Sequence, residues 1–415
     1  MKVGIFTSFT HLDPGYSLCA VVIDQLHGLI GRGYKPVLFT LPMFKDEALL
    51  PEGVEVRKVV PQIILEPYKG TEYPAHWKDD TKKVTDAVKE HCADITHLIC
   101  HDIFFIDSFL PYNIGIRDAL PGLPDMKILA WVHSAPSTRP VLENNPHASR
   151  YALNDSRIKL VYLNYDKAQV LAEMYGAWLK DVRVVMNSRD PRTFWDLHPL
   201  VLKIIQDYSL FFADIVTVYP LSTPRMISGK GLDRVVKIHS KLKLLGYKTR
   251  LIVCNAHANA VKDKKMLSDF KVWAAGLDIA MEEICFTSEQ SIPDYELGVP
   301  PKVVSDLFRL SNVFIFPTVS ENSSLVLLEA MLSGNLLVLN EKVGTLREHA
   351  GTDALYMDFD YREPKEKNEA YYLDLAKVIA SQFEVSIPMQ AKRHALQKHN
   401  YDIIGRNIDI LLHEI

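Results

Sequence analysis

The stretch SNVFIFPTVSENSSLVLLEAMLSGNLLVLNEKVGTLREH, residues 311–349, decides the fold. The run from Val313 to Pro317 is apolar until its proline, which is typical of a strand buried on both faces. Apolar residues then recur at helical spacing from Leu325 to Leu332, and Gly334 supplies a stop signal. A second apolar run, Leu336 to Leu339, follows at once. The stretch therefore predicts a strand, a short crossover helix and a second strand of a parallel sheet.

Two glutamates lie in this unit, Glu321 in the turn after the first strand and Glu329 within the helix. Ligands of open α/β sheets bind outside the carboxyl ends of the strands. Asn322, Ser323 and Ser324 are all good N-cap residue types, and the free amides of a helix N-terminus bind anions. A phosphate cradle beside carboxylates that accept bonds from hydroxyl groups suggests a nucleotide sugar as the ligand.

The two glutamates form the pattern E-x7-E, with Gly334 after it. This pattern resembles the signature of retaining GT-B glycosyltransferases, above all those of family 4. The resemblance implies an α/β fold of the GT-B type, with two Rossmann-like, doubly wound domains that face each other across a cleft. It implies that Glu321 holds a donor-sugar hydroxyl, that Glu329 accepts bonds from the ribose, and that Leu325 ends the donor loop. The family reads E-G-F-G-L in this loop, whereas this chain reads E-N-S-S-L.

Two cations lie between a predicted strand, Asp214 to Tyr219, and a helix predicted to begin near Leu232. Arg225 can neutralise a diphosphate through its fork and Lys230 as a point charge. Their R-x4-K-G spacing resembles the family motif whose arginine and lysine hold the donor pyrophosphate. Competing phosphate motifs do not fit, because Arg234 replaces the third glycine of a dinucleotide fingerprint and no P-loop serine or threonine follows the lysine.

The chain opens with a strand–helix–strand pattern over Lys2–Thr7, Leu18–Gly31 and Pro36–Leu41. The loop between the first strand and the helix is expected to face the ligand. Gly15 is therefore a candidate donor contact, where the family carries a glycine-rich loop, and Tyr16 is a candidate on the acceptor side.

Polar residues follow the other predicted strands. His101 and Asp102 end one of them, where a neutral histidine can bind sugar hydroxyls and an aspartate can take the acceptor's proton. His133 ends the next strand and resembles the family's histidine that contacts the donor sugar. Asn187 resembles the asparagine that closes the family's first domain. Thr287 lies in the segment that meets the nucleobase in that family.

We expect residues 1–200 to form a domain on the acceptor side and residues 201–394 to form the donor domain. Residues 190–210 have no clear sheet pattern and suggest the crossing between them. The final helix of GT-B enzymes often crosses back to the first domain, so residues 395–415 are expected to pack there.

Composition and charge argue against several classes of protein. The chain of 415 residues has a formal net charge of -4, so no strong overall field draws it to nucleic acid or anionic lipid. Its apolar runs fall short of a transmembrane segment, and the opening MKVGIFTSF lacks the layout of a signal peptide. Its 5 cysteines are scattered, which favours reduced thiols in a cytoplasmic protein over disulfides or a metal site.

These patterns predict a retaining, metal-independent hexosyl- or pentosyltransferase that uses a nucleoside-diphosphate sugar as co-substrate and has no other cofactor. The acceptor stays open: a carbohydrate, a lipid-linked sugar, a protein or a hydroxylated DNA base. A second class is a non-catalytic protein that binds nucleotide sugars or carbohydrates, which the replaced motif glycines favour. A third is another GT-B enzyme, such as a sugar-nucleotide epimerase or a phosphorylase.

Overall fold

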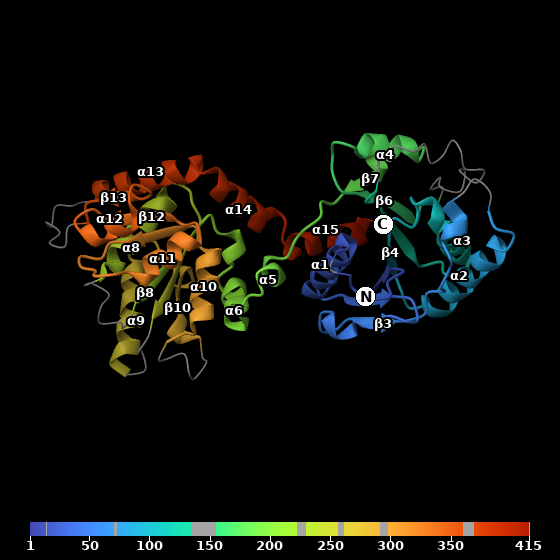
Figure 1. Ribbon diagram of the computed structural model, residues 1–415, viewed down its shortest axis with the longest axis horizontal. Coiled ribbons are helices and arrows are strands. Elements are labelled where there is room, and N and C mark those ends of the chain that lie inside the picture. The colour runs from blue at the N-terminus through green and yellow to red at the C-terminus, as the bar shows by residue number, and fades with distance from the viewer. Residues whose placement is uncertain are drawn as a thin grey trace. The chain divides into compact units, whose positions relative to one another are not determined.

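The computed structural model describes residues 1–13, 15–69, 73–134, 155–221, 230–255, 261–290, 298–359 and 369–414. The chain forms two compact units, one of Met1–Asp190 with Lys398–Ile415 and one of Pro191–Gln397. Each unit contains parallel strands flanked by helices (Figure 1). The predicted class, an α/β protein with two Rossmann-like units, is confirmed.

The first unit is built on a seven-stranded parallel sheet in the order β3-β2-β1-β4-β5-β6-β7. This is the doubly wound order, and its direction reverses between β1 and β4. At the centre, Ile5 lies between Leu38 of β2 and Ile99 of β4. The strands are β1 Lys2–Phe6, β2 Lys35–Phe39, β3 Glu55–Arg57, β4 His97–His101, β5 Lys127–Trp131, β6 Ile158–Tyr162 and β7 Val182–Val184.

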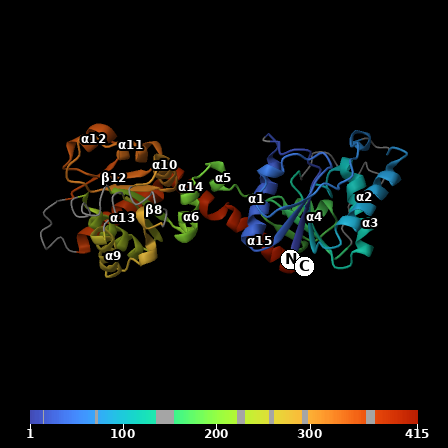
Figure 2. The same cartoon turned by 90° about the horizontal axis from the view of Figure 1, so that it is seen from below.

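Helices cover both faces of this sheet, because successive side chains of each strand point to opposite sides. Ile5 belongs to the core under α1 and α15, whereas Phe6 belongs to the core under α2 and α3. Figures 1 and 2 show the two pairs of helices on the two faces. The helices of the unit are α1 Ser17–Gly31, α2 Trp77–His91, α3 Leu110–Ala119, α4 Ala168–Met174 and α15 Tyr401–Glu414.

The tail helix α15 packs directly on α1 of the first unit. The two backbones nearly touch at Gly28 and Gly405. A Cβ atom on Gly405 would lie 2.5 Å from the Gly28 carbonyl oxygen, and one on Gly28 would lie 2.9 Å from the Gly405 Cα. Glycine is therefore required on both sides of the crossing. Around it, Ile404 and Ile408 are buried against the sheet.

The second unit contains two parallel three-stranded sheets, β10-β9-β8 and β11-β12-β13. Asn312 joins them: its backbone N–H donates to the Val216 carbonyl at 3.0 Å, and its side-chain oxygen accepts from the Val216 N–H at 2.9 Å. Side by side, the sheets repeat the doubly wound order, which reverses between β8 and β11. The strands are β8 Ile215–Leu221, β9 Thr249–Asn255, β10 Ile284–Phe286, β11 Val313–Phe316, β12 Leu336–Asn340 and β13 Leu355–Met357.

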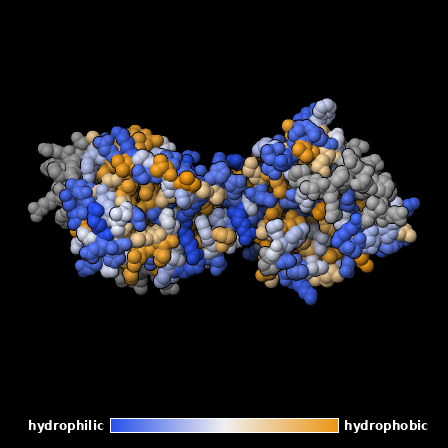
Figure 3. Space-filling view, turned by 45° about the horizontal axis from the view of Figure 1, so that its top comes forward, coloured by the Kyte–Doolittle hydropathy of each residue, from blue (hydrophilic) through white to orange (hydrophobic). Residues whose placement is uncertain are grey.

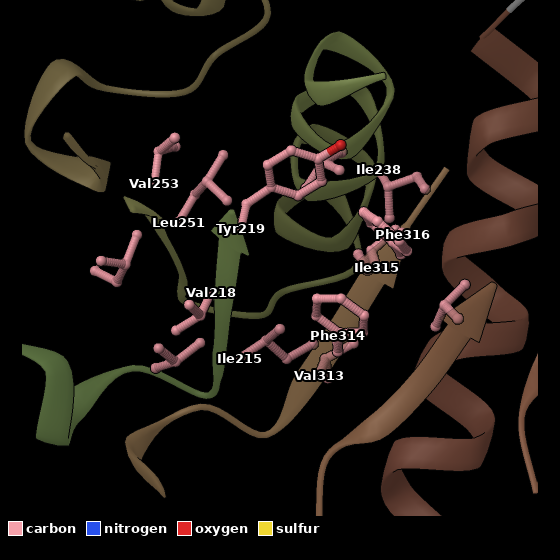
Figure 4. Close-up of a cluster of buried hydrophobic side chains, with 14 of the residues drawn as sticks. Ile215, Val218, Tyr219, Ile238, Leu251, Val253, Val313, Phe314, Ile315 and Phe316 are labelled. Carbon is pink, nitrogen blue, oxygen red and sulfur yellow. The ribbon is translucent and has the colours of Figure 1, made fainter. Parts of the chain in front are cut away.

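The two sheets of this unit share one hydrophobic core. Figure 4 shows part of it, with Tyr219 from β8, Phe316 from β11 and Ile238 from α8. The rings of Tyr219 and Phe316 lie 6.3 Å apart. The helices of the unit are α5 Pro191–Phe194, α6 Pro199–Asp207, α8 Leu232–Leu244, α9 Val261–Ala275, α10 Pro301–Leu310, α11 Leu325–Leu332, α12 Gly344–Ala350, α13 Glu369–Val385 and α14 Ile387–Lys398.

The first unit ends at Asp190, earlier than the boundary at residue 200 that the sequence suggested. The reason is α6, whose Leu200, Val201 and Ile204 are buried in the core of the second unit. The crossing segment that seemed to lack a pattern is therefore in part a helix of that unit.

Hydrophobic and hydrophilic residues are interspersed on the face of each unit seen in Figure 3. Within the described ranges, no helix has both the length and the apolar character that a membrane crossing would need. All five cysteines are free thiols, and Cys254 is the one that is partly exposed.

Candidate functional site

The candidate donor site lies at the carboxyl ends of β8 and β11, where the strand order of the second unit reverses. Lys230 lies two positions before the first residue of α8, and Glu321 lies in the turn between β11 and α11. Although they are 91 positions apart, Lys230 Nζ lies 3.4 Å from Glu321 Oε2. The side chains keep 25% and 20% of their surface exposed, so both remain accessible to a ligand. The two sequence motifs thus meet at one point.

The loop before α8 is held tightly against the end of β11. Gly231 has a φ of +77°, and a Cβ atom there would lie 2.9 Å from the Pro317 ring. The Tyr219 hydroxyl donates to the Lys230 carbonyl. These contacts give a physical reason for the glycine after Lys230, because only glycine allows both this φ and this approach.

The turn that carries Glu321 is fixed from two sides. Of the three candidate cap residues, Ser324 caps α11, since its hydroxyl accepts a hydrogen bond from the Leu327 N–H at 3.2 Å. The Thr345 hydroxyl, at the start of α12, donates to the Glu321 carbonyl at 2.7 Å. Sequence reasoning missed Thr345, although its place in a helix start directly after a strand was a usable signal.

The neighbouring positions of the loop are exposed to solvent. Ser323 is exposed, and its hydroxyl lies 3.5 Å from His349 Nε2. Leu325, which ends the predicted donor loop, is 71% exposed. The unpaired amides of the first turn of α11 therefore lie beside an accessible surface.

Glu329 reaches from α11 toward the end of β9. It is partly buried, and burial raises the pKa of its carboxyl group. Burial also raises the pKa of the Cys254 thiol, with the nearby charge of Glu329 as a further cause, which places the carboxylate near the carboxyl end of β9. The E-x7-E pattern thus supplies one carboxylate at the β8–β11 reversal and another toward β9.

The other predicted donor contacts are held by local interactions. Gly15 is exposed, and its N–H donates to Asp13 Oδ1 at 2.8 Å. The carbonyl of the exposed Asn187 lies 3.4 Å from His399 Nδ1. Thr287 follows β10 and is fully buried, backbone included, so it offers no exposed surface to a nucleobase in this structure. Arg225 lies outside the described residues.

A chain of hydrogen bonds joins three residues at the carboxyl ends of β4 and β5 in the first unit. His101 Nδ1 lies 2.8 Å from His133 Nε2, and His101 Nε2 lies 2.9 Å from the side-chain oxygen of Gln25 on α1. Because an amide oxygen only accepts, His101 Nε2 carries a proton. A neutral His101 then accepts at Nδ1 from His133 Nε2, and a neutral His133 keeps Nδ1 free of a proton. Burial lowers the pKa of both histidines, which keeps them neutral.

Gln25 was not predicted as part of the site. The clue in the sequence was a polar residue in the middle of an apolar helix stripe. In the structure Gln25 is fully buried. Both nitrogens of His101 are engaged, so in this structure His101 positions His133.

Asp102 organises the segment after β5. It adopts a positive φ of 55°, and its carboxylate accepts bonds from the His133 N–H at 2.7 Å, the Ser134 N–H at 3.2 Å and the Ser134 hydroxyl at 2.7 Å. Burial, followed by the charge of Asp102, raises the pKa of Tyr16 on the neighbouring loop. The structure therefore brings together the three residues predicted on the acceptor side, Tyr16, His101 and Asp102, with His133, which was predicted to contact the donor sugar.

In the parts of the chain that the structure describes, no three His, Cys, Asp or Glu side chains are grouped as a metal site requires. The positive groups described at the donor site are therefore Lys230 and the amino ends of α8 and α11.

A scan against models of protein families finds no match, and a search of curated proteins finds none. Solved structures do resemble the chain. A glycosyltransferase from Rickettsia africae is 13% identical, with a TM-score of 0.38 over 100% of this chain and 98% of that one. The Anabaena protein HepE in complex with UDP is 15% identical, with a TM-score of 0.34 over 100% of both chains. A trehalose 6-phosphate synthase from Burkholderia multivorans is 12% identical, with a TM-score of 0.36 over 100% and 96%.

Proposed function

We propose that the protein is a glycosyltransferase of the GT-B type, similar to family 4, that transfers a sugar from a nucleoside-diphosphate sugar to a hydroxyl group. The observation that carries the proposal is the 3.4 Å approach of Lys230 to Glu321 at the strand-order reversal of the second unit. A cation, a carboxylate and two helix N-termini converge there. A diphosphate and a sugar ring are the two chemical groups that this combination binds.

Each group has a proposed role in donor binding. Lys230 leaves Glu321 and pairs with the diphosphate, together with Arg225. Glu321 then accepts a hydrogen bond from a donor-sugar hydroxyl, and Glu329 accepts bonds from the ribose. The first amides of α11, near Ser324, point at the phosphate. The raised pKa of Glu329 fits a carboxylate whose partners arrive with the ligand.

The proposed reaction depends on stabilising the negative charge that develops on the departing diphosphate. The bond from the anomeric carbon to the diphosphate breaks, and the acceptor oxygen bonds to that carbon on the same face, which retains the configuration. The acceptor's proton passes to the departing phosphate oxygen. Lys230 and the helix N-termini stabilise the negative charge that develops, and one such preorganised donor commonly contributes about 3–4 kcal/mol. No metal ion is assigned a role, and activity in EDTA tests that assignment.

His133 has a proposed place beside the donor sugar. The chain of hydrogen bonds from Gln25 through His101 presents it as a neutral ring that donates at Nε2 to His101. Its Nδ1 then accepts from a sugar hydroxyl.

The test is a thermal-shift panel of UDP-, GDP-, ADP- and CMP-sugars on the wild type, Glu329→Ala and Lys230→Met. A donor at about a hundred times its Kd stabilises the unit that binds it by about 2.7 kcal/mol, which corresponds to roughly 5–10 °C. We expect this shift with one nucleotide and a clearly smaller shift in both variants. Glu282→Ala is the matched control, because Glu282 is an exposed glutamate before β10, at the opposite edge of the sheet.

Absence of a shift with every donor would refute the proposal. A shift without glycoside formation on any acceptor, and without slow donor hydrolysis, would instead identify a protein that only binds nucleotide sugars. Release of a monosaccharide isomer or a sugar phosphate would identify an epimerase or a phosphorylase.

A further inference from the structure

Two side chains of α12 contact the turn that carries Glu321. The Thr345 hydroxyl donates to the Glu321 carbonyl at 2.7 Å, and His349 Nε2 lies 3.5 Å from the Ser323 hydroxyl. Residues four apart on a helix lie on the same side of it, which is why both can reach one turn. His349 therefore lies against the segment whose carboxylate is proposed to bind the donor sugar.

The backbone of this turn is held by short hydrogen bonds from side chains. The buried Asn340 side chain at the end of β12 donates to the Thr318 carbonyl at 2.9 Å. The Thr318 hydroxyl donates to the Ser320 carbonyl at 3.0 Å. With the bond from Thr345, three carbonyls of the turn are fixed in this way. The turn therefore has its shape before a donor arrives, although it lacks the glycines of the family motif.

The ring of His349 is held in one tautomer. Its Nδ1 lies 2.7 Å from the Thr345 carbonyl oxygen, which can only accept, so Nδ1 carries a proton. In the neutral ring Nε2 is then a hydrogen-bond acceptor. His349 is partly exposed and Ser323 is exposed, so a ligand on the turn can reach this acceptor.

The functional groups of the turn make longer contacts than the bonds that hold its backbone. The 3.5 Å between Ser323 and His349 is at the outer limit of a hydrogen bond, and the 3.4 Å between Lys230 and Glu321 is similar. Glu321 Oε1 accepts from the Asn322 N–H at 3.3 Å. The Glu321 carboxylate and His349 Nε2 thus keep the capacity to accept stronger hydrogen bonds from a ligand.

Residues 341–350 contain two cations, and both are engaged elsewhere. Lys342 lies 3.8 Å from an Asp358 carboxylate oxygen and 3.4 Å from that of the preceding residue. The Arg347 guanidinium lies 4.0 Å from the centre of the Tyr356 ring on β13. Once Lys230 pairs with the diphosphate, a negatively charged sugar at the turn would meet the charge of Glu321.

We propose that His349 Nε2 accepts a hydrogen bond from a second hydroxyl of the donor sugar, in addition to the hydroxyl bound by Glu321. The inference rests on the proposed function, since it names the class of sugar that the donor site takes. Two acceptors, one of them charged, select a neutral sugar that offers hydroxyl groups, such as a hexose or a pentose. A uronic or sialic acid would bring a second carboxylate to Glu321, and like charges at close range repel.

The experiment measures the Kd of UDP and of UDP-glucose by calorimetry on the full chain. GDP with GDP-mannose or ADP with ADP-glucose replaces this pair where the thermal-shift panel identifies that nucleotide. The ratio of the two Kd values reports the contribution of the sugar, and binding of the bare diphosphate reports that a variant is folded. His349→Phe keeps an aromatic ring without its nitrogens and should reduce the affinity for UDP-glucose, relative to UDP, roughly 3- to 10-fold.

Two variants frame this result. His349→Gln supplies an acceptor at a similar reach and should recover most of the ratio. His394→Phe is the matched control, because His394 is an exposed histidine of α14, which packs at the amino ends of β8 and β11, at the opposite edge of the sheet. In the wild type, UDP-glucuronate should bind roughly fivefold or more weakly than UDP-glucose.

An unchanged ratio in His349→Phe, an equal loss for UDP and UDP-glucose, or a preference for UDP-glucuronate or CMP-sialic acid would overturn the inference. The donor shift separates the two levels. A protein that binds a donor and transfers its sugar, but whose ratio is the same in His349→Phe, keeps the proposed function and refutes only the role of His349. A protein without any donor shift refutes the proposed function and the role of His349 with it.

Discussion

Replacing Gly28 by alanine tests the closest helix contact of the first unit. The added methyl group would lie 2.9 Å from the Cα and the N of Gly405, whereas ordinary van der Waals contacts begin near 3.4 Å. The obstructing atoms belong to a helix backbone, so no flexible side chain can move aside. Helices α1 and α15 must therefore separate by about half an ångström, which loses about a quarter of the dispersion energy of each affected contact.

The magnitude follows from two opposing terms. Overpacking of this kind typically costs about 1–3 kcal/mol, and backbone against backbone belongs at the upper end. The exchange of glycine for alanine inside a helix returns about 1 kcal/mol of helix propensity. The net loss for Gly28→Ala is then about 2 kcal/mol, or roughly 4–8 °C in the melting temperature of a unit of this size.

Gly31→Ala is the matched control on the same helix. A Cβ atom there would meet only the Tyr401 ring, at 3.8 Å, so this variant should be neutral or slightly stabilised. The assay is hydrogen exchange of the amides in α1 and α15 during mild urea unfolding, because two units need not unfold as one transition. Equal protection of α1 and α15 in Gly28→Ala and Gly31→Ala would refute the reasoning.

Three further predictions concern the second unit. Burial lowers the pKa of His239 to about 3. Below pH 6.5 the unfolded chain gains a proton that the folded chain does not bind, so the free energy of unfolding should fall by about 1.4 kcal/mol per pH unit. His239→Gln should remove this slope in acid titrations. Burial lowers the pKa of Lys392 to about 8. Between about pH 8 and 10.4 only the unfolded chain holds the proton, so the contribution of Lys392 to the free energy of unfolding should rise by about 1.4 kcal/mol per pH unit. Lys392→Met should abolish that rise. Asn312→Ala should cost about 2–4 kcal/mol in denaturant unfolding, because it removes bonds to Val216 and to the Asp214 carbonyl between β8 and β11.

The controls are chosen by exposure. His349→Gln and Lys342→Met change a partly exposed histidine and an exposed lysine of the same unit, and Asn322→Ala changes an exposed asparagine. An unchanged acid slope in His239→Gln, an unchanged alkaline rise in Lys392→Met, or an Asn312→Ala variant as stable as Asn322→Ala would contradict the corresponding prediction.

Local patterns predicted the elements of the second unit well, because burial on both faces leaves continuous apolar runs. The run from Val313 and the helix from Leu325 to Leu332 appear where the sequence put them. A helix cap near Ser324 could also be predicted from the sequence, since the N-cap preference is a property of the residue and its neighbours. What failed was the boundary at residue 200, because the apolar face of α6 does not say which core it joins.

The site was harder to derive, because its contacts join distant positions. Nothing in the residues around Gln25 indicates a hydrogen bond to a histidine, since its partner, His101, lies on β4, 76 positions further along the chain. The contact between His101 and His133 could have been predicted: His101 ends β4 and His133 follows β5, and the carboxyl ends of these neighbouring parallel strands lie at one edge of the sheet. The requirement for glycine at position 231 was equally hard to predict, because the ring that leaves no room for a Cβ atom there belongs to Pro317, in a different motif.

The return of α15 to the first unit has a consequence for synthesis of the chain. Residues 191–397 are made between the two parts of that unit. At ribosomal speeds this takes roughly 10–40 s. Throughout that interval α1 can already pack against the sheet, but the surface around Gly28 that α15 later covers lacks that cover. The first unit is therefore completed only after α15, which follows the second unit in the sequence, has been synthesised.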